Sequence, residues 1–141
     1  MVWLRYAIDY GVIGLLLLMS VIAVGLALER WSALRKVRVD EYADKREFEI
    51  TITRKLHMIA TIGANAPYVG LLGTVLGIML TFYTMGERGF MDSGKIMTGL
   101  ALALKATAMG LVVAIPSIVF YNMLVRKAKV LLLEWDVHHG K

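Results

Sequence analysis

Threonine hydroxyls recur along an uncharged apolar stretch, residues 66–86. Thr74, Thr81 and Thr84 fall near one line on a helical wheel, beside Gly70 and Gly77, so together they form a narrow and weakly polar stripe. A threonine in a membrane helix can bond back to a carbonyl of its own helix, or it can face a polar passage. The stripe is therefore consistent with helix packing or with the lining of a narrow passage around a further helix.

A second apolar stretch, residues 96–125, carries a matching hydroxyl. Thr74 lies twelve residues before Gly86, and Thr107 lies twelve residues after Lys95. At about 1.5 Å of rise per residue, each threonine is roughly 18 Å from the intervening turn, so both hydroxyls are predicted at one depth near the bilayer middle. Small residues recur every three to four positions beside these threonines and allow close helix approach. They are Gly73 and Gly77 before the turn, and Ala103, Gly110, Ala114 and Ser117 after it.

Lys105 is a charged side chain inside the second of these stretches. An unpaired charge in mid-membrane costs roughly 2.5–3.5 kcal/mol on insertion scales, which makes such a residue a candidate for function. Lys105 lies about 15 Å from the turn and points about 160° away from Thr107 around the helix. We predict an assembly or partner contact at Lys105, with a carboxylate supplied by another subunit, another protein, Asp9 or Glu87.

The sequence has few candidate residues for catalysis or for metal or cofactor binding. The chain has no cysteine, which excludes disulfides, thiolate catalysis and cysteine metal sites. His57, His138 and His139 do not have the spacing of a metal site. The sequence also shows no nucleophile–base pair, no phosphate-binding loop and no paired carboxylates. We therefore expect neither an enzyme nor a metal or cofactor protein.

Composition indicates a small membrane protein. The chain has 141 residues, 58% of them hydrophobic, and its mean hydropathy is +0.65, whereas soluble domains are roughly 45–50% apolar. The net charge is +5. Its basic residues flank the apolar spans, as the positive-inside rule predicts, so nucleic acid is not an expected partner.

Three membrane-spanning helices are predicted. Residues 11–28 form an uncharged run long enough for one crossing, and residues 66–86 and 96–125 supply the other two. Pro67 is expected to open the second of these helices after a break near Asn65–Ala66, and Pro67 and Gly73 are also assigned to assembly or partner contacts. The polar segment 86–95 is predicted to be a tight turn.

The charged segment 29–58 is predicted to be an amphipathic helix that leads into the second span. Phe48, Ile52, Leu56 and Ile59 recur at helical spacing, although alternation at Phe48, Ile50 and Ile52 would also suit a short strand. The organisation expected is therefore an N-terminus and first span at 1–28, a cytoplasmic helical region at 29–65, and a helical hairpin with a C-terminal extension at 66–141.

Orientation follows from the Lys and Arg residues in the connecting segments. The loop 29–58 carries eight and the tail 126–141 carries four, whereas residues 1–10 carry one and the loop 86–95 carries two. The positive-inside rule then places the N-terminus in the periplasm and the C-terminus in the cytoplasm.

Two strings, ATIGANAPYVGLLGTVLGIMLTFYTM and GLALALKATAMGLVVAIPSIVFYN, resemble the ExbB/TolQ/MotA proton-channel family, and most closely its ExbB members. The resemblance covers about residues 59–125. It implies a bacterial inner-membrane ring, typically a homopentamer, around the membrane helix of a single-span ExbD-like (or TolR-like) protein. Proton flow through that centre would drive work on a TonB-like protein and the outer membrane, with membrane lipid around the ring. The family's pore threonines match Thr74 and Thr107.

The small-residue faces extend the predicted pore lining to Gly77, Thr81, Ala103, Gly110 and Ala114. Leu102 stands where ExbB and TolQ have a membrane glutamate, so the resemblance implies that a partner's carboxylate carries the proton. A TolQ-like or MotA-like motor subunit is the nearest alternative. A non-conducting membrane scaffold is an alternative of a different class.

Overall fold

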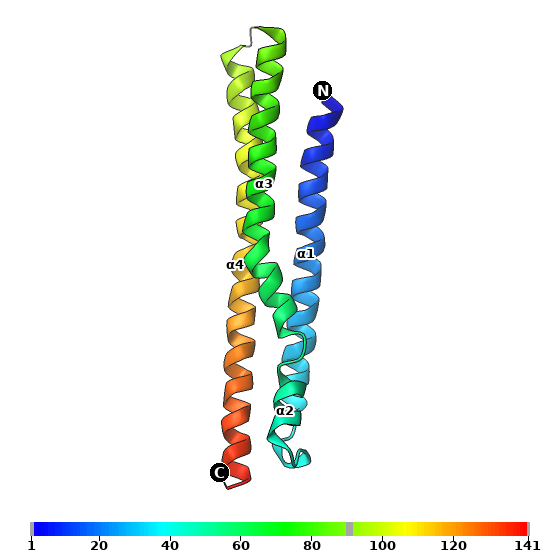
Figure 1. Ribbon diagram of the computed structural model, residues 1–141, viewed down its shortest axis with the longest axis vertical. Helices are drawn as coiled ribbons and strands as arrows, with labels where there is room; N and C mark the ends of the chain where they lie inside the picture. Colours follow the sequence, from blue (N-terminus) through cyan, green and yellow to red (C-terminus); the bar gives the residue numbers. More distant parts are fainter. Residues whose placement is uncertain (1, 90–91, 141) are drawn as a thin grey trace.

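Three long helices run side by side in the computed structural model, which describes residues 2–89 and 92–140 (Figure 1). They are α1 (Val2–Lys36), α3 (Leu56–Arg88) and α4 (Ser93–His138). A 3₁₀ turn, η1 (Val39–Glu41), and a short helix, α2 (Lys45–Ile52), connect α1 to α3. All three long helices have the length and apolar composition that a membrane crossing requires. The predicted all-α membrane class and the three predicted spans are confirmed.

Helices α3 and α4 form an antiparallel hairpin whose backbones touch at two glycines. A Cβ atom added to Gly70 would lie 2.5 Å from the Ala106 carbonyl oxygen, and one added to Gly110 would lie 2.6 Å from that of Ala66. No side chain fits between backbones at this distance, so the hairpin can pack this closely only with glycine at these two positions. The close approach that the sequence predicts is confirmed here, and also at Gly77, where an added Cβ would lie 2.9 Å from the Cβ of Ala103.

The predicted helix break near Asn65–Ala66 is wrong. Helix α3 continues through Pro67 from Leu56 to Arg88, although it bends along its length (Figure 1). Proline leaves the carbonyl of Gly63 without its usual helical donor, but neighbouring helices hold such a turn in place within a membrane bundle. Gly63 packs against Ile118 of α4, and the Asn65 amide donates to the Thr61 carbonyl one turn earlier at 2.8 Å. Packing thus outweighs the local preference.

The segment between α1 and α3 is also more divided than predicted. Helix α1 continues to Lys36, and α2 is a separate helix. The helical conformation is interrupted before α3 at Lys55, which has a φ of 66°. The Asp44 carboxylate caps α2 by accepting from the Arg46 backbone N–H at 2.9 Å. That hydrogen bond lowers the pKa of Asp44, and the Arg46 side chain adds to the effect.

The predicted apolar face of this segment is confirmed as the centre of a core. Phe48, Ile52 and Ile59 are fully buried and Leu56 is nearly so, whereas Ile50 is 72% exposed, which excludes the strand alternative. Their partners come from the far ends of the two other long helices: Leu34, Leu124, Ala128, Leu131 and Trp135. Trp135 donates its indole N–H to the Tyr42 carbonyl at 2.9 Å. The extension of α4 beyond its apolar stretch is therefore held by α2.

The turn between α3 and α4 is shorter than the predicted segment 86–95. Gly86 belongs to α3, which ends at Arg88, and Lys95 belongs to α4, which begins at Ser93. Gly89 terminates α3 with a φ of 71°, a left-handed conformation that glycine adopts without steric cost. Residues 90 and 91 of the predicted turn lie outside the described residues.

Candidate functional site

The hydroxyls of Thr74 and Thr107 contact each other between α3 and α4. The Thr74 hydroxyl also lies 2.8 Å from the Ala103 carbonyl and 3.3 Å from the Gly70 carbonyl. Thr74 is buried and Thr107 is half-buried. The equal depth that the sequence predicts for these two residues is confirmed, because two antiparallel helices that leave one turn bring positions at equal distances from it together.

The other residues predicted to line a pore lie inside this hairpin in the single chain. Ala103 and Ala114 are nearly fully buried, Gly77 and Gly110 contact the opposite helix, and Thr81 has no exposed surface. They determine how closely α3 approaches α4. They therefore belong to the α3–α4 contact in the single chain.

Thr107 lies on the side of α4 that faces away from α1. Lys105 lines a pocket with residues of α1, and two residues further along the helix the direction has turned by about 200°. Leu102 lines the same pocket as Lys105. One face of α4 therefore carries Lys105 against α1, and another presents the Thr107 hydroxyl beside α3.

The residues assigned to assembly or partner contacts are engaged within the chain. An added Cβ at Gly73 would lie 2.8 Å from the Cβ of Ala106 and 3.0 Å from the Cγ1 of Val12, so three helices meet there. Pro67 is half-buried in α3. Glu87 accepts from the Tyr83 hydroxyl at 3.1 Å, one turn away on α3. Among the carboxylates considered for Lys105 within the chain, Asp9 is the one in its pocket.

Arg5 is a polar contact that the sequence did not predict. Its guanidinium donates to the Thr81 hydroxyl at 3.0 Å, and that hydroxyl donates to the Gly77 carbonyl at 2.9 Å. Arg5 stands at one end of a cleft of about 790 Å³ near the α3–α4 turn, which Asp9, Arg88, Asp92 and Lys95 also line. The signal in the sequence was an arginine within the first turns of a mostly apolar helix, too near the end of that helix to require a buried partner.

Comparison with known proteins adds the family. Residues 25–137 match the model of the MotA/TolQ/ExbB proton channel family. The chain belongs to this family. Biopolymer transport protein ExbB of Aquifex aeolicus is 52% identical over 98% of this chain and 93% of its own length. The putative biopolymer transport protein ExbB-like 2 of Helicobacter pylori (strain ATCC 700392 / 26695) is 53% identical over 96% of this chain and 91% of its own length.

The chain has three helices of membrane length and belongs to the MotA/TolQ/ExbB family, which together indicate an inner-membrane protein. This family consists of transport proteins and is not a class of enzymes. ExbB of Pseudomonas putida matches over only 69 residues, 21% of its own length, whereas the two relatives above match almost end to end. This chain therefore covers nearly the full length of those two relatives.

Proposed function

We propose that this chain is the ring-forming subunit of a proton-conducting complex in the inner membrane. With an ExbD-type single-span partner, the ring would use the proton motive force to energise TonB-dependent transport across the outer membrane. Family membership supports the class of function. The observation that supports a lining role for this chain is the Thr74–Thr107 hydroxyl pair on the part of the hairpin that α1 leaves free.

A ring with α1 outside and the hairpin inside directs this hydroxyl pair toward the centre. Thr107 would be the residue nearest the passage, and Thr74 would orient it by hydrogen bonding. The buried residues Gly77, Thr81, Ala103, Gly110 and Ala114 would form the wall behind the pair. Because Leu102 cannot ionise and lies on the α1 side of α4, the proton carrier in this proposal is a carboxylate of the partner's membrane helix.

A non-conducting scaffold is a second candidate, and one observation favours it. The Thr74 hydroxyl lies within hydrogen-bonding distance of carbonyls of both helices, which packing alone would produce. A TolQ-like or MotA-like motor subunit would share the fold and the ring and would differ in the machinery that it drives.

The mass of the detergent-extracted particle tests the ring. Each chain has a mass of 15.7 kDa, so a homopentamer has a protein mass of about 79 kDa, five times that value. We expect native mass spectrometry or light scattering, corrected for detergent, to give a multiple of the chain mass near five. A monomeric particle under conditions that preserve the helical content would contradict the proposal.

Orientation can be tested on a background free of cysteine, since the chain has none. Lys36→Cys and Lys129→Cys place a thiol at exposed positions of the end that contains α2, and Lys95→Cys places one at an exposed position near the α3–α4 turn. We expect a membrane-impermeant maleimide added to intact spheroplasts to label only Lys95→Cys. Lysis should expose the two other positions to the reagent. The reverse pattern would overturn the periplasmic N-terminus.

A further inference from the structure

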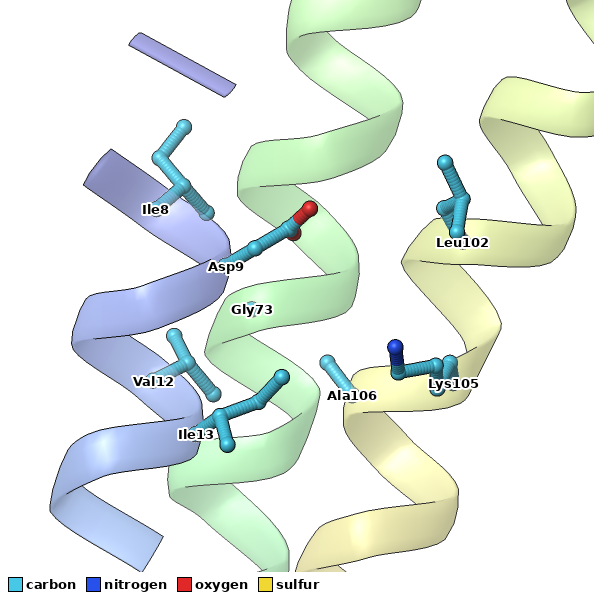
Figure 2. Close-up of a pocket in the computed structure, with 8 residues that line it drawn as sticks. All are labelled: Ile8, Asp9, Val12, Ile13, Gly73, Leu102, Lys105 and Ala106. Atoms are coloured by element: carbon cyan, nitrogen blue, oxygen red, sulfur yellow. The ribbon is translucent and has the colours of Figure 1, made fainter. Parts of the chain in front are cut away.

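A small pocket between α1 and α4 contains two opposite charges. Asp9 extends from α1 across α3 toward α4, and the ammonium group of Lys105 extends from α4 into the same space (Figure 2). The other lining residues carry no charge; they are Ile8, Val12, Ile13, Gly73, Leu102 and Ala106. In the part of the chain that the structure describes, the two charged groups do not form a direct ion pair.

Gly73 provides the space in which these charges face each other. Any side chain at this position of α3 would clash with Ala106 and Val12, so α1 and α4 approach each other where α3 has no side chain. The pocket has a volume of about 10 Å³, which is at the lower limit of the space that one water molecule needs. A water held there has a carboxylate on one side and an ammonium group on the other, so it can bond to both.

The two charges also lie at one height in the bilayer. Twenty-one residues separate Lys105 from Arg126 on α4, and twenty separate Asp9 from Glu29 on α1. At about 1.5 Å per residue each of these two spans is roughly 30 Å long. If Arg126 and Glu29 lie at one level, Asp9 and Lys105 therefore also lie at one level. At this level Asp9 is half-buried and also lines the cleft that contains Arg5, whereas the Lys105 side chain is exposed on α4.

We propose that Asp9 is the counter-ion of Lys105 within the same chain, bridged by one water molecule over Gly73. The pair neutralises the lysine inside the subunit and attaches α1 to the α3–α4 hairpin. A neighbouring subunit or partner protein is then not required to supply a carboxylate. This inference concerns the assembly of one subunit, and it holds whether or not the ring conducts protons.

A charge-neutralisation cycle tests the pairing. Removing one member of a paired charge leaves the other unpaired, whereas removing both is nearly neutral. We expect Asp9→Asn and Lys105→Met each to lower the Tm of the solubilised protein by at least about 2–4 °C, and Asp9→Asn/Lys105→Met to recover most of that loss. Equal and additive losses in the double variant would overturn the pairing. If a single variant gives no folded protein, the yield of the double variant decides in the same way.

Arg5 provides the matched control, because it precedes Asp9 by one helical turn and lines the neighbouring cleft together with Asp9. Its guanidinium is already bonded to Thr81, so Arg5→Gln should show no coupling to Asp9→Asn. Coupling of Asp9 to Arg5 instead of Lys105 would replace the proposed counter-ion.

Mixed expression distinguishes a pair within one chain from a pair between chains. Chains with Asp9→Asn and chains with Lys105→Met are produced together, so each type keeps the charge that the other lacks. A pair within the chain predicts a Tm as low as that of either single variant. A Tm in the mixture that lies above that of both single variants would show that the pair joins neighbouring subunits and would overturn the assignment to one chain.

Discussion

Replacing both Thr74 and Thr107 by valine is expected to reduce proton-dependent transport at least about tenfold while the particle keeps its mass. Valine preserves the branched shape of threonine but removes the hydroxyl. A tenfold loss corresponds to about 1.4 kcal/mol in a barrier, which is similar to the net value of one hydrogen bond. Internal pH changes in vesicles that contain the complex with its ExbD-type partner measure the transport, and the mass of the extracted particle measures the assembly.

Thr84 and Thr98 are matched controls, one on each helix of the hairpin. Among the described residues, each hydroxyl bonds to a carbonyl of its own helix, that of Leu80 at 2.8 Å and that of Gly94 at 2.9 Å. Thr84→Val with Thr98→Val should leave transport near the wild-type level. If the Thr74 and Thr107 variant transports as well as this control, the hydroxyl pair serves packing alone and the scaffold becomes the better proposal.

Alanine at Gly70 or Gly110 is expected to destabilise the protein, although alanine normally favours helix over glycine. The added Cβ would lie 2.5–2.6 Å from a backbone carbonyl oxygen, and a backbone cannot rotate out of the way as a flexible side chain can. Overpacking of this kind typically costs about 1–3 kcal/mol, and each variant should therefore unfold at a lower temperature in detergent. Gly70→Leu should prevent formation of the hairpin and reduce the yield of folded protein.

Alanine at Gly14 or Gly25 of α1 is not expected to destabilise the protein. A Cβ at either position would meet nothing within 4 Å. Gly14→Ala and Gly25→Ala should therefore leave stability unchanged or raise it by up to about 1 kcal/mol per residue, the usual helix preference for alanine over glycine. Equal behaviour of Gly70→Ala and Gly14→Ala in thermal unfolding would contradict the close contact between α3 and α4.

Features that follow from the geometry of a single helix were predictable. The apolar face of Phe48, Ile52, Leu56 and Ile59 depends only on the 3.6-residue repeat. The common depth of Thr74 and Thr107 depends only on a constant rise per residue and a short turn. The strings around these threonines also carry enough of the family pattern to identify it. In each case the information is local, or it concerns two helices joined by one turn.

Features that depend on a third helix or on packing were decided by the tertiary structure. Local preference predicted a break at Pro67, but the continuity of α3 depends on the neighbour that packs against Gly63. The contacts of Arg5 with Thr81 and of Asp9 with the Lys105 pocket depend on the height and rotation of α1 against the hairpin. The periodicity of apolar residues in the sequence gives neither the height nor the rotation of α1. They are set where Val12 packs onto Gly73, since only a residue without a side chain lets α1 and α4 meet across α3.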